Sequence, residues 1–263
     1  MKQEILAELN MIQQKENVKI LYAVESGSRG WGFESKDSDW DVRFFYIHEP
    51  NWYLSIEDKR DTLEYPINGD LDLSGWELRK TLNLFRKSNP PLLEWLRCPI
   101  IYLEQFTTAQ KLRDLIATYF SPKSCMYHYL HMAIGNYREY LKGDSVRVKK
   151  YFYVLRPILA CKWIENNDTM APMEFQRLLD TQLDNPKLKA EIDKLKMRKM
   201  DGEELDVEPR IGIINDFLEE RIAYYEKYVE QYNSKKEPDI EKLNLLFRET
   251  LNEVWSNASA TIG

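Results

Sequence analysis

Residues 27–43 of this chain are GSRGWGFESKDSDWDVR, a glycine- and serine-rich turn followed by two aspartates one residue apart. The segments on either side of it, residues 19–24 and 42–47, are short and rich in β-branched and aromatic residues, so each predicts a β-strand. We therefore expect the stretch to connect two strands and to carry its polar side chains at the mouth of a sheet.

The first part of the stretch is suited to binding a phosphate group. Ser28 can begin a short helix, so that its hydroxyl and the unpaired amides of the first turn point at an anion such as a nucleotide phosphate. Gly27, Gly30 and Gly32 would let that phosphate approach the backbone closely. The Gly-Lys-Ser/Thr ending of a P-loop is missing, and the expected helix is too short for a dinucleotide fingerprint, which makes these two phosphate folds unlikely.

The second part of the stretch carries candidate metal ligands, Asp39 and Asp41. Side chains two residues apart lie on the same face of a strand, so these carboxylates would be neighbours while Trp40 points away. Adjacent carboxylates repel unless a cation lies between them, and Mg²⁺ held by one or two carboxylates plus substrate phosphates is the usual solution, with Mn²⁺ as an alternative. Such a site activates an attacking hydroxyl and stabilises a leaving pyrophosphate, so the sequence predicts nucleotidyl transfer.

These residues resemble the signature of a known superfamily, the DNA polymerase β-type nucleotidyltransferases. The residues that carry the resemblance are Gly27-Ser28, Gly32, Ser38-Asp39, Asp41 and Val42-Arg43. A narrower resemblance, over roughly residues 19 to 180, is to the predicted nucleotidyltransferases of bacterial and phage RNA-repair pathways, the RlaP or YcgL-like group. It rests on residues 72–80, 88–96, 121–124, 127–129, 149–151 and 156–157.

A third carboxylate is expected on a hairpin. The Asn-Gly pair at residues 68–69, between two β-type segments, is a strong signal for a two-residue turn. Asp70 and Asp72 share a strand face, so either could complete a triad with the first two aspartates. The resemblance favours Asp72, because the aspartate before residues 73–76 occupies the family's third carboxylate position. Its role would be to accept the proton of the attacking hydroxyl or to help hold the metal.

The composition limits the class of protein. At 263 residues, with 43% hydrophobic and 30% charged residues, the chain can bury a substantial core. No segment approaches the roughly 18 consecutive apolar residues of a membrane span, and the N-terminus lacks a signal-peptide pattern, so we expect a cytoplasmic protein with no membrane partner. Cys98, Cys125 and Cys161 are too widely spaced for a disulfide framework or a structural zinc site. The net charge of −6 means that nucleic-acid binding would need a local basic patch.

The order of elements predicts an α+β fold in two parts. Residues 1–104 would form a polymerase β-like nucleotidyltransferase domain with a small mixed sheet, and residues 105–263 an all-helical domain that binds substrate and nucleotide. The expected helices are 2–14, 75–86, 122–143, 146–165, 186–200, 209–233 and 239–257, with a connector at 234–238.

A basic cluster in the helical part is the second candidate site. On the helix expected over 146–165, Arg147 and Lys150 lie on one face, with Lys149 and Arg156 beside it. A Lys and an Arg across a cleft from the metal would neutralise pyrophosphate as it leaves, so Lys149, Lys150 and Arg156 join Gly27 and Ser28 as candidate nucleotide ligands. The alternatives are a solvated helix face and a structural role for Arg156.

Histidines and tyrosines of the next segment are weaker candidates. His128 and His131 could share a helix face, but no third ligand has suitable spacing for zinc, so we expect them in the core or lining a cleft. Tyr127, Tyr129 and Tyr137 are expected to pack as aromatic residues, with base stacking as the alternative.

The sequence therefore predicts an enzyme that moves a nucleoside monophosphate from an NTP to a hydroxyl and releases pyrophosphate. The resemblance implies that the acceptor could be an RNA end in RNA repair. Transfer to a small molecule or a protein side chain stays open, because the chain has no recognisable RNA-binding module. A nucleotide-binding regulator similar to an antitoxin, with little catalysis, is the alternative from another class.

Overall fold

The N-terminal part of the chain is built on a five-stranded mixed sheet with the order β3-β4-β2-β1-β5. The computed structural model describes residues 1–65, 69–203, 205–232 and 239–256. The strands are β1 (Val18–Glu25), β2 (Trp40–His48), β3 (Thr62–Glu64), β4 (Leu71–Glu77) and β5 (Ile101–Glu104). Only β2 and β4 run parallel among these neighbours, and the other pairs are antiparallel. The predicted hairpin is present as β3 and β4, although Pro66, Ile67 and Asn68 lie outside the described residues.

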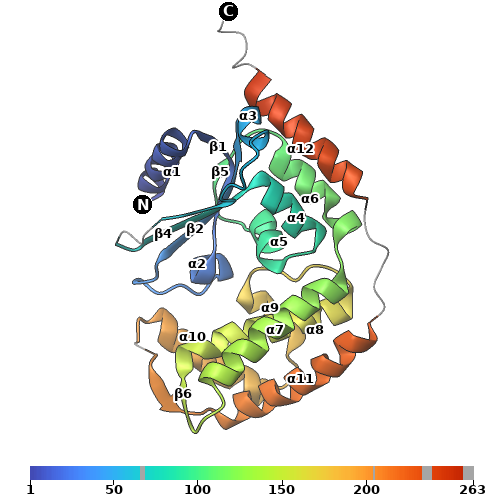
Figure 1. Cartoon of the computed structure of the whole chain (residues 1–263). Helices are drawn as coiled ribbons and strands as arrows, with labels where there is room; N and C mark the ends of the chain where they lie inside the picture. Colours follow the sequence, from blue (N-terminus) through green and yellow to red (C-terminus); the bar gives the residue numbers. More distant parts are fainter. Residues whose placement is uncertain (66–68, 204, 233–238, 257–263) are drawn as a thin grey trace, which may run out of the picture.

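Helices cover both faces of this sheet (Figure 1). On one face α1 (Lys2–Glu16) packs against β1 and β5 through Ile5, Leu9 and Ile12. The other face carries α4 (Leu78–Arg86), α5 (Pro90–Arg97), α6 (Thr108–Tyr119) and α12 (Ile240–Trp255). Because β1 is covered on both sides, nearly all of its residues are buried, as the apolar run in its sequence requires.

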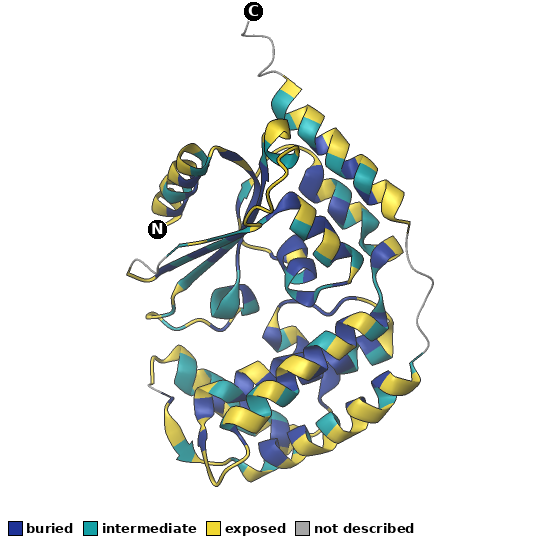
Figure 2. Ribbon diagram, viewed as in Figure 1, coloured by how far each residue is buried: buried dark blue, intermediate teal, exposed yellow. Residues whose placement is uncertain are grey.

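The rest of the chain forms a helical layer beneath the sheet. It consists of α7 (Pro122–Tyr140), α8 (Tyr151–Asn167), α9 (Phe175–Gln182), α10 (Pro186–Met200) and α11 (Gly212–Gln231). Two short strands, β6 (Ser145–Arg147) and β7 (Val207–Pro209), pair beside it, and the short helices α2 (Gly27–Trp31) and α3 (Pro50–Tyr53) belong to the sheet part. Figure 2 shows that the faces of α7 and α8 that meet are buried, while α11 is exposed on its outer side.

Three predicted helices begin three or more residues later than expected. One of them, expected from residue 209, begins at Gly212 because Pro209 belongs to β7. The helix expected from Gly75 begins at Leu78, because Gly75 and Trp76 extend β4. A Cβ at Gly75 would lie 2.1 Å from the Phe44 ring, so the close packing of β4 on β2 requires glycine there. The helix expected over residues 146–165 is wrong in its first turn: residues 145–147 pair with β7, η1 (Val148–Lys150) is a 3-10 turn, and α8 begins at Tyr151.

The α+β class is confirmed, with the five-stranded sheet in the N-terminal part and mainly helices after it. The part expected to be all-helical also contains the pair of short strands β6 and β7. The last helix, α12, returns to the sheet part and packs on α4 and α6. The division at residue 104 stays a prediction, and the connector at 234–238 lies outside the described residues. None of the helices in the described part of the chain is long and apolar enough to cross a membrane.

Candidate active site

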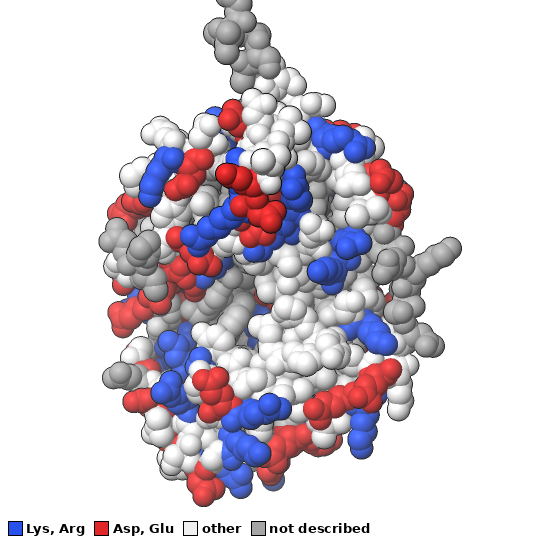
Figure 3. Space-filling model, viewed as in Figure 1, with Lys and Arg blue, Asp and Glu red and all other residues white. Residues whose placement is uncertain are grey.

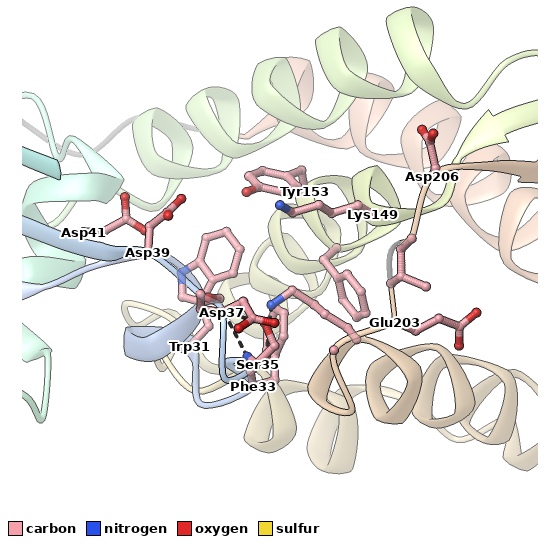
Figure 4. A pocket seen from close by; sticks show the side chains of 16 residues that line it. Trp31, Phe33, Ser35, Asp37, Asp39, Asp41, Lys149, Tyr153, Glu203 and Asp206 are labelled. Atoms are coloured by element: carbon pink, nitrogen blue, oxygen red, sulfur yellow. Dashed lines mark hydrogen bonds between the residues drawn. The ribbon is translucent and has the colours of Figure 1, made fainter. Parts of the chain in front are cut away.

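A cavity of about 600 Å³ opens between the α2 turn and the helical layer. Three segments line it: residues 28–41, residues 149–153 and residues 199–206. Figure 4 shows Asp39 and Asp41 at one end of the cavity, with Lys149 and Tyr153 reaching across from α8 and the turn before it. Acidic side chains therefore face a lysine across one cleft, as the sequence predicts for Lys149.

The turn that opens the cavity is held tightly against Asp41. Gly27 has a φ of +59°, and a Cβ at this position would lie 2.1 Å from Oδ2 of Asp41. Only glycine combines this conformation with so close an approach. Ser28 follows in the first turn of α2, whose N-cap is Ser26, and it lines the cavity.

Two carboxylates of neighbouring strands share one guanidinium beside the cavity. The parallel register sets Asp41 opposite Asp72. Nη2 of Arg43 donates to Oδ2 of Asp72 at 2.7 Å and to Oδ1 of Asp41 at 3.2 Å. A cation thus lies between the two carboxylates, where electrostatics requires one.

Strand register also separates the two candidates for the third carboxylate. Asp72 lies beside Asp41, whereas Asp70 is an exposed turn residue whose carbonyl accepts the amide of Trp40 at 2.6 Å. Among the described residues no group of three His, Cys, Asp or Glu side chains is arranged to hold a metal ion. Asp39 and Asp41 both line the cavity, whereas Asp72 does not line it and contacts Arg43, which also binds Asp41.

A buried glutamate supports the strand that carries Asp41. Glu25 is fully buried and accepts the amide of Asp41 at 2.9 Å and the hydroxyl of Tyr102. Burial raises the pKa of Glu25, and these two donors offset part of the effect. Sequence reasoning missed Glu25, although a carboxylate at the end of a buried strand next to a Gly-Ser turn is an unusual pattern.

Burial and neighbouring charges shift the titration of the cavity's groups. Burial raises the pKa of Asp41, Arg43 lowers it, and the charges of Asp72 and Asp39 raise it further. Burial and the charge of Lys149 lower the pKa of Lys199 to about 8. Lys199 donates to the carbonyl of Phe33 at 3.2 Å, so it is anchored at the wall of the cavity.

The basic cluster predicted from the sequence is divided by the structure. Lys149 lines the cavity, but Lys150 lies over the rings of Tyr140 and Tyr153, 4.4 and 4.9 Å from their centroids. The helical face that was expected to group Lys150 with Arg147 does not exist, because β6 and a 3-10 turn replace the first turn of the helix.

Arg156 is not brought into the cavity. Its side chain is 3% exposed and pairs with Glu94 at 2.8 Å, within a buried cluster that includes the Tyr129 hydroxyl. The guanidinium lies 4.9 Å from the Trp31 ring centroid, behind the wall of the cavity. The phosphate role expected for Arg156 is therefore corrected to a packing role, since its charge is already paired away from the cleft.

Aromatic side chains that sequence reasoning did not assign also line the cavity. They are Trp31, Phe33, Phe152 and Tyr153, and the first two flank Gly32 in the decisive stretch. Their rings pack against one another, with Trp31 and Tyr153 edge to face at 5.6 Å. The two aromatic residues beside Gly32 are a pattern from which their place in the cavity could have been predicted. For Lys199 the sequence offers no such pattern, because it is one of many charged residues in its helix.

The histidines and cysteines lie elsewhere. His128 and His131 line an open groove on α7, and the Tyr127 ring lies 4.4 Å from that of His131. Cys98, Cys125 and Cys161 are buried and unpaired, as their spacing predicts.

A glycine-serine turn, one aspartate just before and one within the following strand, and a helical layer with cations across the cleft define a polymerase β-like nucleotidyltransferase. The model of the RNA repair pathway DNA polymerase beta family, RlaP, matches residues 1–249, and the chain belongs to this family. It is 52% identical over 260 residues to the protein YcgL of Bacillus subtilis (strain 168), covering 99% of this chain and all of the relative. A solved structure of a nucleotidyltransferase-like protein from Exiguobacterium sibiricum 255-15 covers 95% of this chain and 90% of its own, at 12% identity and a TM-score of 0.35.

Proposed function

We propose that this protein transfers a nucleoside monophosphate from an NTP to a hydroxyl group and releases pyrophosphate. The proposal rests on one observation: Asp39 and Asp41 line the same cavity as Lys149 and Lys199. The attacking hydroxyl oxygen bonds to the α-phosphorus, the bond from that phosphorus to the bridging oxygen breaks, and pyrophosphate leaves with its electron pair.

The residues around the cavity suit a nucleotide in size and chemistry. A volume of about 600 Å³ lies within the usual range for small-molecule sites. Ser28 and the close-packed Gly27 turn contact the outer phosphates, while Lys149 and Lys199 neutralise their charge. Trp31 and Tyr153 provide rings on which a base can stack.

The carboxylates fit a divalent cation. Asp39 and Asp41 face the cavity and would hold Mg²⁺ or Mn²⁺ together with the phosphates, since Mg²⁺ commonly takes only one or two protein carboxylates. The bound ion supplies charge neutralisation at the phosphates and a lower pKa for the attacking hydroxyl. Asp72 is the candidate for receiving the hydroxyl proton, and Arg43 holds it beside Asp41.

For the acceptor we propose an RNA end, acting in RNA repair. A ledge formed by Tyr140, Arg147, Lys150 and Tyr153 continues from the cavity wall, and Arg147 lies 5.5 Å from the Tyr140 ring centroid. Exposed rings flanked by cations are a common platform for single-stranded nucleic acid. Figure 3 shows Lys and Arg side chains over β6 and α10, with acidic side chains among them and further basic side chains elsewhere on this face. A small molecule or a protein hydroxyl is the alternative acceptor.

The test is incubation of labelled NTPs and Mg²⁺ with RNA, with a small-molecule polyol and with the protein alone. Label transferred to RNA by the wild type but not by Asp39→Asn or Asp41→Asn supports the proposal. Asp70→Asn is the matched control, since it makes the same change at an exposed turn residue. NTP binding by calorimetry without any transfer would favour the nucleotide-binding regulator instead.

A further inference from the structure

A second cavity, of about 350 Å³, lies between α4 and α12. It is lined by Arg79, Asn83 and Arg86 of α4 and by one face of α12 from Ile240 to Phe247. It shares no lining residue with the cavity of the candidate active site. Figure 1 shows both helices on the same side of the sheet, and α12 packs on α4 and α6.

Two guanidinium groups meet this cavity without a carboxylate partner. Arg79 and Arg86 are seven residues apart, so they lie on one face of α4. Neither forms a salt bridge with any residue that the structure describes, in a chain that carries 43 acidic residues against 37 basic ones. Nε of Arg86 is buried and has no hydrogen-bond partner among the described residues. A buried donor without an acceptor is destabilising. Because Nε itself is buried, a ligand in the cavity would contact the terminal nitrogens of the Arg86 guanidinium instead.

Aromatic rings hold the outer arginine in place. The Arg79 guanidinium lies 5.1 Å from the Tyr53 ring centroid and 5.9 Å from that of Phe247. Stacking of this kind leaves the edges of the guanidinium, which carry its N–H donors, free for another acceptor. Arg79 is thus held in position without a salt bridge to any described residue, and the buried carboxylate of Glu77 behind the helix start is a charge that acts on it.

The other walls of the cavity are apolar or carry amides. Leu82 and Leu243 are buried, and Phe247 also lines the cavity. Asn83 and Asn244 contribute amides, of which Asn244 donates to the exposed carboxylate of Glu241 at 3.0 Å. The cavity therefore has cations on one side and apolar side chains on the other. Its volume of about 350 Å³ is larger than a bare phosphate or carboxylate group needs.

We propose that this cavity binds a small organic oxyanion, with a phosphate or carboxylate group held by Arg79 and Arg86 and an apolar body lying against Leu82, Leu243 and Phe247. Planar guanidinium groups bind both kinds of oxyanion in bidentate geometry. Because the ligand would contact α4 and α12 together, it fastens the last described helix to the sheet part of the molecule.

The experiment is calorimetric titration of the full chain with phenyl phosphate, benzoate and inorganic phosphate. We expect one site per chain for an aromatic oxyanion, with a dissociation constant about tenfold higher in Arg86→Gln and in Arg79→Gln, as for the loss of one charge-assisted hydrogen bond. Phenyl phosphate and benzoate distinguish a phosphate ligand from a carboxylate ligand. Arg79 is exposed, so its variant keeps the test informative if Arg86→Gln fails to fold.

Two control variants distinguish binding at this cavity from binding at other basic side chains. Lys87→Gln removes a charge immediately after the same helix, at a residue that lines a different groove. Lys149→Gln removes a charge from the candidate active site. Binding of an aromatic oxyanion that is unchanged in Lys87→Gln and weakened in the two arginine variants supports the proposal. Binding that is weakened in Lys149→Gln but not in the arginine variants belongs to the candidate active site and counts against the proposal. Absence of binding by all three probes, or equal binding by wild type and arginine variants, would overturn it.

As an independent readout, a bound ligand should slow amide hydrogen exchange in α12. We expect this protection with the aromatic oxyanion in the wild type and its loss in Arg79→Gln. Protection that persists in Arg79→Gln and Arg86→Gln would also contradict the proposed contacts.

Discussion

Nη2 of Arg43 donates a 2.7 Å hydrogen bond to Oδ2 of Asp72 on the neighbouring parallel strand. The same nitrogen lies 3.2 Å from Asp41, so one guanidinium joins two of the three carboxylates expected at the active site. A metal ion that engaged both carboxylates would have to displace Arg43 or share them with it. Arg43 therefore sets the charge balance of the site before any ligand binds.

Replacing this guanidinium should destabilise the protein and make it more responsive to metal. We expect Arg43→Gln to lower the free energy of unfolding by about 1 to 2 kcal/mol in the absence of metal, because the carboxylates of Asp41 and Asp72 lose their shared partner and repel. Urea denaturation with and without Mg²⁺ measures this. The stabilisation by Mg²⁺ should be larger in Arg43→Gln than in the wild type, and an equal effect in both would argue against a metal at these carboxylates.

The two adjacent lysines of η1 should differ in function. Lys149 lines the cavity, whereas Lys150 lies on Tyr140 and Tyr153 outside it. Lys149→Gln should raise the KM for NTP about tenfold through the loss of one charge-assisted contact. Lys150→Gln should leave the NTP KM near the wild-type value and weaken acceptor binding. Steady-state kinetics with each substrate varied in turn gives the KM for NTP and the KM for the acceptor. An equal increase in the KM for NTP in the two variants would contradict the assignment of Lys149, and not Lys150, to the cavity.

Local sequence signals were sufficient for the framework of the candidate site. The apolar runs on both sides of residues 27–41 became β1 and β2. Asp39 and Asp41 line the same cavity, although Asp39 lies just before β2 and only Asp41 lies within it. Helix starts were also predictable, since Ser121 and Asp239 cap their helices with side-chain oxygens. In each case the decisive interactions join residues that are close in sequence.

The parts that depend on long-range contacts were not predictable. The segment 145–147 became a strand because residues 207–209 pair with it, which changed the direction of the following lysines. Both lysines were expected to bind the nucleotide, but Lys149 lines the cavity and Lys150 does not. Arg156 is buried because Glu94, 62 residues earlier, provides its counter-charge. Lys199 reaches the cavity only through the packing of α10 near Phe33, which no local pattern encodes.

The close approach of Gly27 to Asp41 gives a matched pair of glycine variants. Gly27 and Gly32 both have positive φ, but a Cβ at Gly27 would meet Oδ2 of Asp41 at 2.1 Å, whereas one at Gly32 meets nothing within 4 Å. Each alanine variant should lose about 1 kcal/mol of stability for the backbone conformation. Gly27→Ala should in addition displace Asp41 and reduce kcat strongly. Thermal unfolding and turnover of the two variants, compared side by side, test this, and similar kcat values would show that the contact is not needed for activity.

The lowered pKa of Lys199 predicts a pH-dependent affinity for NTP. In the folded protein burial and the charge of Lys149 bring this pKa to about 8, below the ordinary lysine value of 10.5. The charged form is therefore disfavoured by folding, and stability should rise as the pH increases from about 8 toward 10.5. A bound triphosphate has the opposite preference, since it stabilises the ammonium group and raises its pKa.

NTP binding near pH 8 should therefore take up protons, and the affinity should fall as the pH rises through about 8. Calorimetry in two buffers with different ionisation enthalpies measures the proton uptake directly. Lys199→Arg should retain binding with a much flatter pH dependence, because a guanidinium stays charged over this range. Lys199→Met should bind NTP more weakly at every pH and show no uptake from this residue. If Lys199→Met keeps the full wild-type pH dependence, another group is responsible, and Lys199 does not contact the phosphates.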